Sequence, residues 1–363
     1  MKKNRLDILL LISIITLSVF GLIMIASASY VWAEYKFDDP FKFVKNQSLF
    51  FIIGVFLMIF VSKINYKFYY KKANLFVITC FILLVSVLIP GVGTVRNGSR
   101  SWFGIGSFGI QPSEFMKLAL IIFTSKYMCK NEKELKKIVK GVLPILGITL
   151  LVFMLIMLQP DFGTGIIIVM TIIGMLFVGG VPLKFFLRSA LVGIIGIIGL
   201  IIAAPYRLER ILSFVNPWKD PLGSGFQIIQ SLYAIGPGGL FGFGLGGSRQ
   251  KHFYLPEPQT DFIFSIISEE FGFLGIVIIT TLFLIIIYRG FKLSRNSNDL
   301  FSKYLCFGVT FGFAFQTVLN LMVVVGLIPV TGVTLPFLSY GGSSLLITFI
   351  SMGIILGISR TER

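Results

Sequence analysis

The residue best suited to chemistry in this chain is Asp261, a carboxylate where a long polar segment meets an apolar one. It ends the run Pro-Glu-Pro-Gln-Thr-Asp at 256–261 and precedes a stretch rich in Ile and Phe. Two interpretations stay open. Thr260 or Asp261 caps the helix that follows, which is the commoner role for such residues, or the carboxylate transfers protons in a reaction.

A second group of charged residues lies at 111–117, where Glu114 and Lys117 follow Pro112. Pro112 suits the first turn of a helix, so Glu114 and Lys117 fall three apart on one face and can pair. Charges inside a membrane are costly, and they mark either a functional site or an internal ion pair. From the sequence both interpretations are equally open for this pair.

Two adjacent carboxylates, Glu269 and Glu270, follow Asp261 on the same predicted helix. At a rise of 1.5 Å per residue they should lie about 12 Å deeper than Asp261. Carboxylates within an apolar span need partners. Proton relay, helix pairing and neutralisation by a cation are all compatible with the sequence.

Other reactive residue types are scarce. His252 is the only histidine, so no Ser-His-Asp triad and no histidine-based metal site can be assembled. The cysteines Cys80, Cys129 and Cys306 are far apart and indicate neither a disulfide framework nor a metal site. Asp161 sits in a short hairpin, where a turn role is as plausible as a ligand role.

The composition shows which elements must hold these residues. Of 363 residues, 55% are hydrophobic and 13% are charged, whereas a soluble domain has about 25% charged residues. The mean hydropathy is +0.90, and the apolar content is even from end to end. The sequence therefore predicts an all-α integral membrane protein with one polytopic domain over 1–363.

A spanning helix needs about 20 apolar residues, and ten stretches approach that length. They lie at about 7–28, 48–66, 74–91, 112–128, 141–159, 163–181, 185–205, 262–288, 304–326 and 336–358. The first follows a basic N-terminus but is too long for a signal peptide and lacks a clear cleavage site, so we expect it to be retained.

The Lys and Arg residues predict the orientation. With the N-terminus inside, the inner segments hold 21 of them and the outer segments hold 10, while Lys117 lies within the fourth span. This bias favours both termini in the cytoplasm. It also explains the net charge of +16, because basic residues at the cytoplasmic surface are attracted to anionic lipid headgroups. No nucleic-acid partner is indicated.

The segment 206–261, between the seventh and eighth spans, is by far the longest connection and lies outside in this topology. Loops of this length are usually functional or disordered, and its Phe, Tyr, Leu and Ile content argues against disorder. We expect a short helix at 222–235. Its glycines permit close backbone approach to a ligand, but they lack the spacing of a nucleotide-binding loop.

Three stretches match a known family. They are RNGSRSWFGIGSFGIQPSEFMKLAL, NPWKDPLGSGFQIIQSLYAIGPGGLFGFGLGGSRQKHFYLPEPQTDFIFSIISEEFGFLG and PFLSYGGSS. They resemble the signature stretches of the SEDS family, the shape, elongation, division and sporulation proteins RodA, FtsW and SpoVE. The segments RNGSRSW and SRQKHFYLPEPQTDF are closer to FtsW and SpoVE than to RodA, which usually has His where this chain has Gln259.

The resemblance implies a peptidoglycan glycosyltransferase that polymerises lipid II, a disaccharide-peptide on undecaprenyl pyrophosphate. Such proteins act at the outer face of the bacterial cytoplasmic membrane, for cell division or spore cortex synthesis. They work with a class B penicillin-binding protein, a transpeptidase. The essential acidic residue of the family matches Asp261, which favours the catalytic interpretation.

The residues can be compared with that chemistry. Pyrophosphate is a good leaving group, so one carboxylate, Asp261, suffices as general base for the acceptor hydroxyl. Cations must stabilise the departing charge, with Mg²⁺ or Mn²⁺ as candidate helpers. The candidate substrate-binding residues, in the long loop and near the fourth span, are Arg100, Trp102, Glu114, Lys117, Gln227, Gln230, Arg249, Lys251 and Glu257.

Two other functions stay open. The intramembrane charges and glycine-rich spans could line the path of a lipid II flippase or transporter, although no internal repeat is apparent and the polar residues concentrate on one side. A non-enzymatic scaffold for the penicillin-binding protein would leave the convergence of polar residues on one loop unexplained.

Overall fold

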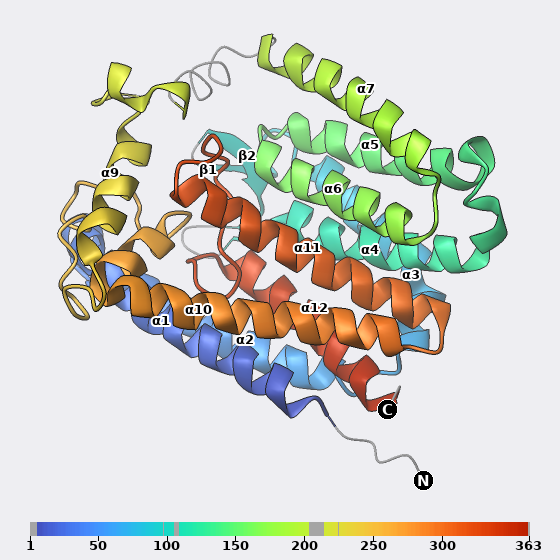
Figure 1. Ribbon diagram of the computed structural model, residues 1–363, viewed down its shortest axis with the longest axis horizontal. Coiled ribbons are helices and arrows are strands. Elements are labelled where there is room, and N and C mark those ends of the chain that lie inside the picture. Colours follow the sequence, from blue (N-terminus) through green and yellow to red (C-terminus); the bar gives the residue numbers. More distant parts are fainter. Residues whose placement is uncertain (1–5, 97, 105–108, 203–213, 224, 362–363) are drawn as a thin grey trace.

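The computed structural model describes residues 6–96, 98–104, 109–202, 214–223 and 225–361. Within them lie eleven α-helices and one β-hairpin (Figure 1). The first seven helices are α1 (Ile8–Phe37), α2 (Lys42–Val61), α3 (Tyr66–Ser86), α4 (Pro112–Lys130), α5 (Leu143–Met157), α6 (Phe162–Val178) and α7 (Leu183–Ile202). The others are α9 (Phe226–Ile235), α10 (Ile263–Asn296), α11 (Leu300–Val324) and α12 (Gly342–Thr361).

The helices confirm a polytopic, predominantly helical membrane protein. Seven helical stretches are long and apolar enough to cross a bilayer: α1, α2, α3, Ile138–Met157, α10, α11 and α12, and α6 is a shorter apolar helix. Each of the ten predicted spans overlaps a helix, although 203–205 of the seventh lie outside the described residues.

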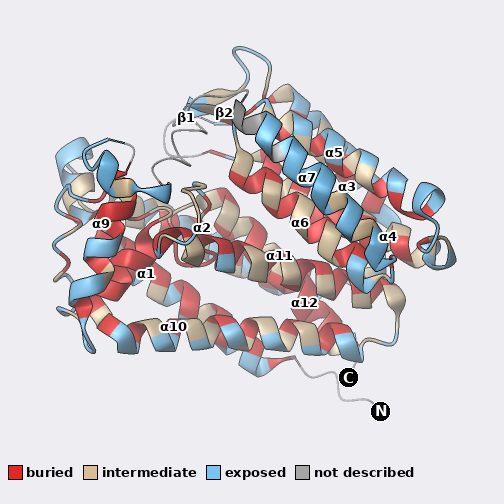
Figure 2. Ribbon diagram, turned by 45° about the horizontal axis from the view of Figure 1, so that its top comes forward, coloured by how far each residue is buried: buried red, intermediate tan, exposed pale blue. Residues whose placement is uncertain are grey.

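Among the seven candidate spans, α11 and α12 are the most deeply buried, and they lie at the centre of the bundle (Figure 2). Glycines let α2 approach α12 closely. A Cβ on Gly353 would lie 2.7 Å from the carbonyl oxygen of Met58, and one on Gly54 would overlap the ring of Phe349. Such small residues at helix contacts are how membrane helices gain van der Waals packing.

The start of α1 and the end of α12 lie at the same end of the bundle (Figure 1). The backbone N–H of Asp7, just before α1, donates to Ser359 Oγ on α12 at 3.3 Å. The Asp7 carboxylate is buried and accepts a hydrogen bond from Arg289 Nε on α10 at 2.8 Å. A buried carboxylate and guanidinium neutralise each other, and this pair together with the bond to Ser359 joins α1, α10 and α12.

The helix α10 is broken at Gly272, whose φ of 59° and ψ of −157° are not helical. Such a conformation suits glycine because it has no Cβ atom. The break frees backbone groups that need new partners within a membrane. Residues 239–244, which we call the strap, supply them through four bonds: Phe243 N to Glu269 O (3.0 Å), Gly244 N to Glu270 O (2.9 Å), Phe273 N to Gly239 O (2.9 Å) and Leu274 N to Leu240 O (3.0 Å).

The polar connections hold both expected and unexpected structure. The predicted helix at 222–235 is present as α9, which begins four residues later, while 206–213 and 224 of the long loop lie outside the described residues. The segment 92–111 contains an antiparallel hairpin of β1 (Thr94–Arg96) and β2 (Ser99–Trp102). These short strands were not predicted from the sequence.

Candidate active site

Asp261 lies in a tight turn just before α10. Its Oδ1 accepts a hydrogen bond from Thr260 Oγ1 at 2.9 Å, and its backbone oxygen accepts one from Asn320 Nδ2 on α11 at 2.7 Å. The N-cap of α10 is Phe262, whose side chain makes no capping hydrogen bond. Thr260 and Asp261 are therefore not the N-cap residue, and the capping interpretation loses its support.

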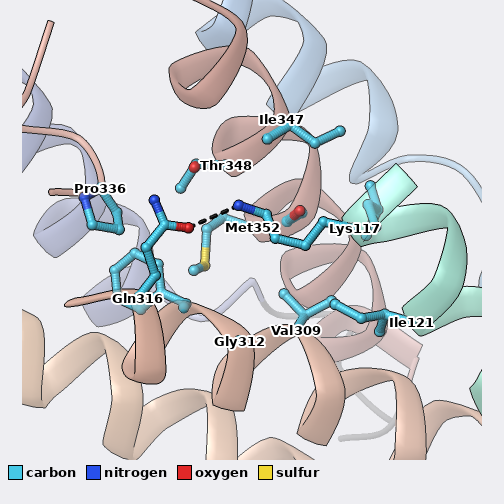
Figure 3. Close-up of a pocket in the computed structure, with 12 residues that line it drawn as sticks. Lys117, Ile121, Val309, Gly312, Gln316, Pro336, Ile347, Thr348 and Met352 are labelled. Atoms are coloured by element: carbon cyan, nitrogen blue, oxygen red, sulfur yellow. Dashed lines mark hydrogen bonds between the residues drawn. The ribbon is translucent and has the colours of Figure 1, made fainter. Parts of the chain in front are cut away.

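Glu114 and Lys117 form the ion pair that their spacing predicted. Lys117 Nζ lies 3.0 Å from Glu114 Oε2, and both side chains are almost buried. The same ammonium donates to Gln316 Oε1 on α11 at 2.8 Å (Figure 3). Lys117 and Gln316 line a mostly apolar cavity of about 30 Å³ between α4, α11 and α12, which is room for a water molecule.

One helix, α11, therefore contacts both candidate groups. Asn320 holds the backbone of Asp261, and Gln316 holds the ammonium of Lys117. Residues four apart on a helix lie on the same face, about 6 Å apart along the axis. Asp261 and Lys117 are separated by 144 positions in the sequence. In the fold, the two residues that contact them lie within one turn of α11.

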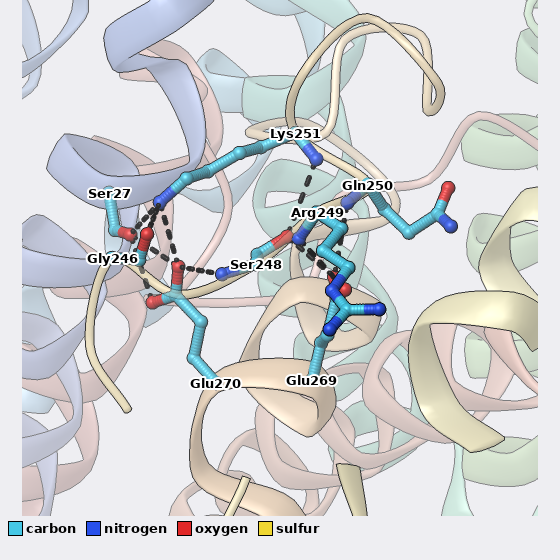
Figure 4. A network of polar contacts seen from close by, with 8 residues as sticks. All are labelled: Ser27, Gly246, Ser248, Arg249, Gln250, Lys251, Glu269 and Glu270. Carbon is cyan, nitrogen blue, oxygen red and sulfur yellow. Dashed lines mark hydrogen bonds and ion pairs between the residues drawn. The ribbon is translucent and has the colours of Figure 1, made fainter. Parts of the chain in front are cut away.

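The carboxylate of Glu269 accepts three hydrogen bonds from the long loop (Figure 4). The donors are Ser248 Oγ at 2.5 Å, Arg249 N at 2.8 Å and Gln250 N at 3.3 Å. Two of them are backbone amides, which bind a carboxylate whatever side chains the loop carries. Glu269 therefore anchors the loop segment 248–250 to α10.

Glu270 forms a buried ion pair with Lys251, whose Nζ lies 3.0 Å from Oε1 (Figure 4). Ser27 on α1 also donates to this carboxylate at 2.6 Å. Lys251 Nζ makes further contacts with Gly246 O at 2.7 Å and Ser27 Oγ at 3.2 Å. These contacts occupy the ammonium, so neutralisation is the role that the geometry favours for Glu270. A substrate-binding role for Lys251 stays a prediction.

The expected depth of the two glutamates was wrong. Asp261 touches Asn320, but Ser265 is hydrogen-bonded to Ser231 at 2.7 Å, and Ser231 also reaches the backbone of Val324 at 2.6 Å. From 261 to 265 the chain thus moves toward the C-terminal end of α11 and not toward the bundle centre. The expected depth required 262–288 to be one straight helix running inward from Asp261. The break at Gly272, which follows both glutamates, separates 263–271 from the rest of α10, so the two parts need not share one direction.

The other predicted site residues lie on several elements. Arg100 and Trp102 are half-buried on β2, beside the α5–α6 turn, where Ser101 Oγ donates to Gln159 O at 3.4 Å. Gln227 and Gln230 are half-buried on α9. Glu257 lies in the Asp261 turn, where its backbone oxygen, and not its carboxylate, accepts from Thr260 Oγ1 at 2.7 Å. Arg249 is exposed, with its guanidinium 5.0 Å from the centre of the Phe243 ring.

Asp161 takes a turn role and also contacts the start of α4. It is the N-cap of α6, where Oδ1 accepts from Thr164 N at 3.1 Å, and Oδ2 accepts from Gln111 Nε2 at 2.8 Å. Desolvation by burial raises the pKa of the Asp161 carboxyl above its usual value, against the opposing effect of the hydrogen bonds to Thr164.

The described residues contain no group of three or more His, Cys, Asp or Glu side chains that could hold a metal ion. Magnesium prefers six oxygen ligands, which usually come from carboxylates, water molecules and substrate phosphates. The described side chains therefore do not by themselves form a site for Mg²⁺ or Mn²⁺.

The residues that sequence reasoning missed are the amides on α11, Gln316 and Asn320, and the hydroxyls of Ser27 and Ser248. Gln316 and Asn320 did carry a signal, because polar amides within an apolar span need hydrogen-bond partners. Their spacing of four predicts a shared face. Which residues they face depends on the packing of α4 and the Asp261 turn against α11.

Comparisons with known proteins agree with this architecture. The family model for FtsW/RodA/SpoVE cell cycle proteins matches residues 7–363. Stage V sporulation protein E of Bacillus subtilis is 54% identical over 362 residues, which cover 100% of this chain and 99% of that protein. The probable peptidoglycan glycosyltransferase FtsW of Trichlorobacter lovleyi is 41% identical over 353 residues, covering 97% and 93%.

Solved structures share the fold. One of them is a chain of a peptidoglycan synthase complex that was solved to explain how polymerisation and crosslinking are coordinated. It superposes with a TM-score of 0.80 at 30% identity, covering 99% of this chain and 98% of that one. The rod shape determining protein RodA of Thermus thermophilus superposes with a TM-score of 0.70 at 28% identity, with the same coverage.

Proposed function

The chain belongs to the FtsW/RodA/SpoVE family of cell cycle proteins, and we propose that it is a peptidoglycan glycosyltransferase that polymerises lipid II. Relatives that are 37–41% identical over nearly their full length are named as probable enzymes of this kind. The relative from Bacillus subtilis is named for sporulation. The reaction would therefore serve cell division or spore cortex synthesis.

In the proposed reaction, the Asp261 carboxylate takes the proton of the acceptor sugar's hydroxyl group. The resulting oxygen nucleophile attacks the anomeric carbon of the donor sugar and forms the new glycosidic C–O bond. The anomeric C–O bond to pyrophosphate breaks at the same carbon, and undecaprenyl pyrophosphate leaves with its negative charge. No acid is needed, since pyrophosphate leaves without protonation.

The observation that carries this proposal is the convergence of Asp261 and Lys117 on one face of α11. Among the described residues, two contacts of the Lys117 ammonium are with Glu114 and Gln316. An ammonium has three hydrogens, so a third remains for an oxygen of the substrate. In a nearly dry site that charge stabilises a departing pyrophosphate more strongly than in water.

The proposed topology has ten spans, with both termini in the cytoplasm and the active site outside. The hydrogen bond between Asp7 and Ser359 joins the start of α1 and the end of α12 on one side, which supports an even number of crossings. The excess of Lys and Arg in the segments at that side supports the cytoplasmic assignment. Asp261 lies near the C-terminal end of α11, toward the opposite side.

A class B penicillin-binding protein is the proposed partner. The support is the likeness to a chain of a peptidoglycan synthase complex in which polymerisation and crosslinking are coordinated. A transpeptidase would use the glycan strands as they emerge at the outer face of the membrane.

The test is reconstitution of the purified protein with this partner on lipid II in vesicles. The wild type should produce glycan strands, and Asp261→Asn should lower the rate by at least about 100-fold, which is the lower range for a general base. Asp299→Asn is the matched control. Asp299 caps α11 by accepting from Ser302 N at 3.1 Å, and Asn caps a helix equally well.

Three outcomes separate the alternatives. Strands made equally well by folded Asp261→Asn would remove Asp261 from catalysis. Wild-type protein that moves lipid II across sealed vesicles but makes no strands would favour a transporter. Protein that does neither, yet binds the transpeptidase and raises its activity, would favour a scaffold.

A further inference from the structure

Gln316 and Asn320 each bridge two parts of the chain. Gln316 accepts from Lys117 with Oε1 and donates to Thr334 O at 2.9 Å with Nε2. Asn320 donates with Nδ2 to both Asp261 O and Val333 O at 2.7 Å. The pair thus joins α4, the Asp261 turn and the segment 333–334 to one face of α11.

Both amides are buried: 4% of Gln316 and 1% of Asn320 is exposed. Burying an amide is costly unless it is hydrogen-bonded, and the Nδ2 group of Asn320 is bonded, whereas its Oδ1 has no partner among the described residues. Both Nδ2 hydrogens of Asn320 are used by backbone carbonyls, and a rotation of the amide group by 180° would set Oδ1 against those carbonyls. The side chain is therefore held in one orientation, and so is the backbone of Asp261.

The two amides stand one helical turn apart, about 6 Å along a buried helix. A helix interior changes length very little because its backbone hydrogen bonds fix the rise. The distance between the backbone of Asp261 and the ammonium of Lys117 is therefore set by α11, although neither residue belongs to that helix.

We propose that Gln316 and Asn320 are positioning residues that hold the carboxylate of Asp261 and the ammonium of Lys117 at the separation that one substrate requires. This inference rests on the proposed function, since it assigns Asp261 to the acceptor hydroxyl and Lys117 to the departing pyrophosphate. The acceptor hydroxyl and the pyrophosphate are the entering and leaving groups of the same anomeric carbon, so a change of about 1 Å in the separation of Asp261 and Lys117 should slow the reaction by up to about 100-fold.

A merely structural role would differ in its consequences. If the amides only fastened the segment 333–334 to α11, their loss would lower stability and leave the folded molecules equally active. If they position Asp261 and Lys117, folded molecules should turn over more slowly while lipid II binding changes little. The kcat and KM of folded, reconstituted enzyme separate the two roles.

The experiment uses Asn320→Leu and Gln316→Met, which keep the approximate shape and remove the amide. Each is reconstituted with the transpeptidase on lipid II, and rates are divided by the folded fraction from size-exclusion chromatography. We expect kcat to fall about 10–100-fold with KM within about threefold. Thr317→Val is the control, since it removes a buried hydrogen bond on α11, from Oγ1 to Phe313 O at 2.9 Å, and should keep kcat within about threefold of wild type.

The double variant tests whether the two amides act as one unit. Breaking either end loosens the separation, so the double variant should be no more than about threefold slower than the slower single variant. Fully multiplicative losses in kcat would overturn the inference, as would an unchanged kcat in Gln316→Met or Asn320→Leu.

Two further arms keep the result clear. If Asn320→Leu does not fold, Asn320→Ala takes its place with the same expectation, because Ala removes the amide hydrogens and adds neither a charge nor a new donor. If that variant does not fold either, the kcat of Gln316→Met alone tests the inference: a fall of about 10–100-fold supports it and an unchanged value overturns it. Wild-type protein that makes no strands would count against the proposed function, whereas active wild type with inactive Asp261→Asn and fully active amide variants would overturn this inference alone.

Discussion

Gly242 of the strap and Gly272 of α10 cross in direct backbone contact. A Cβ atom on Gly272 would lie 2.4 Å from the backbone N of Gly242, and one on Gly242 would lie 2.3 Å from the carbonyl oxygen of Glu270. Both residues have positive φ angles, 72° at Gly242 and 59° at Gly272. No side chain fits at this crossing, which fixes the strap against the break in α10.

We therefore expect Gly272→Ala to lower the free energy of unfolding by about 2–5 kcal/mol, through the backbone clash and the strained φ together. Gly244→Ala separates the two effects. Gly244 also has a positive φ, 85°, but nothing lies within 4 Å of its Cβ position, so its cost should be about 1 kcal/mol.

Gly147→Ala serves as the control for this series, because Gly147 lies in α5 with open space at its Cβ position. It should be neutral or stabilise by up to about 1 kcal/mol. Thermal unfolding of the purified proteins in detergent measures the series. Equal losses for Gly272→Ala and Gly244→Ala would contradict the crossing.

The buried pair of Lys251 and Glu270 should be needed as a pair. Lys251→Met leaves the Glu270 carboxylate buried without its cation, which should cost about 3–5 kcal/mol. The double variant Lys251→Met/Glu270→Gln removes both charges and should recover part of that loss. A double variant as unstable as the single would show that charge balance is not the reason for the pairing.

The exposed pair of Lys45 and Asp39 gives the comparison. These side chains lie 2.9 Å apart, but 65% of Lys45 and 34% of Asp39 is exposed. Solvent screens such a pair, so Lys45→Ala should leave the thermal unfolding of the protein nearly unchanged. A loss as large as that of Lys251→Met would mean that burial does not decide the effect.

Structural and catalytic roles of Lys117 can be separated by removing its ion pair completely. In Glu114→Gln/Lys117→Met no uncompensated charge is left behind, so the protein should fold with a melting temperature within a few degrees of wild type. Strand synthesis should nevertheless fall by at least about 100-fold, because the pyrophosphate loses its cation. Full activity in this double variant would assign the pair to folding alone.

The Asp161 carboxyl predicts a pH dependence of stability. Its pKa is raised on folding by burial, so the ionised form is disfavoured in the folded state. Its contribution is most favourable below the ordinary pKa of 3.8 and is lost as the pH rises through the raised value. Asp161→Asn stays neutral, so its melting temperature relative to wild type should increase from pH 4 to pH 8. A difference that is constant with pH would exclude this explanation.

The sequence by itself determined the class of protein and most of the elements. Long apolar runs with few charges form helices in a bilayer, because a helix satisfies its own backbone hydrogen bonds. For this reason the predicted spans overlap the observed helices, α9 appears near its expected place, and Glu114 pairs with Lys117. These are local features, set by residues within one or two helical turns.

Only the tertiary structure decided how the site is assembled. The strap completes a helix some 30 residues further along the chain, and α11 holds both Asp261 and Lys117 through Asn320 and Gln316. The sequence showed a glycine-rich loop and two amides but not their partners. Helix periodicity fixes the face on which a residue lies, whereas the packing of separate helices fixes which other face it meets.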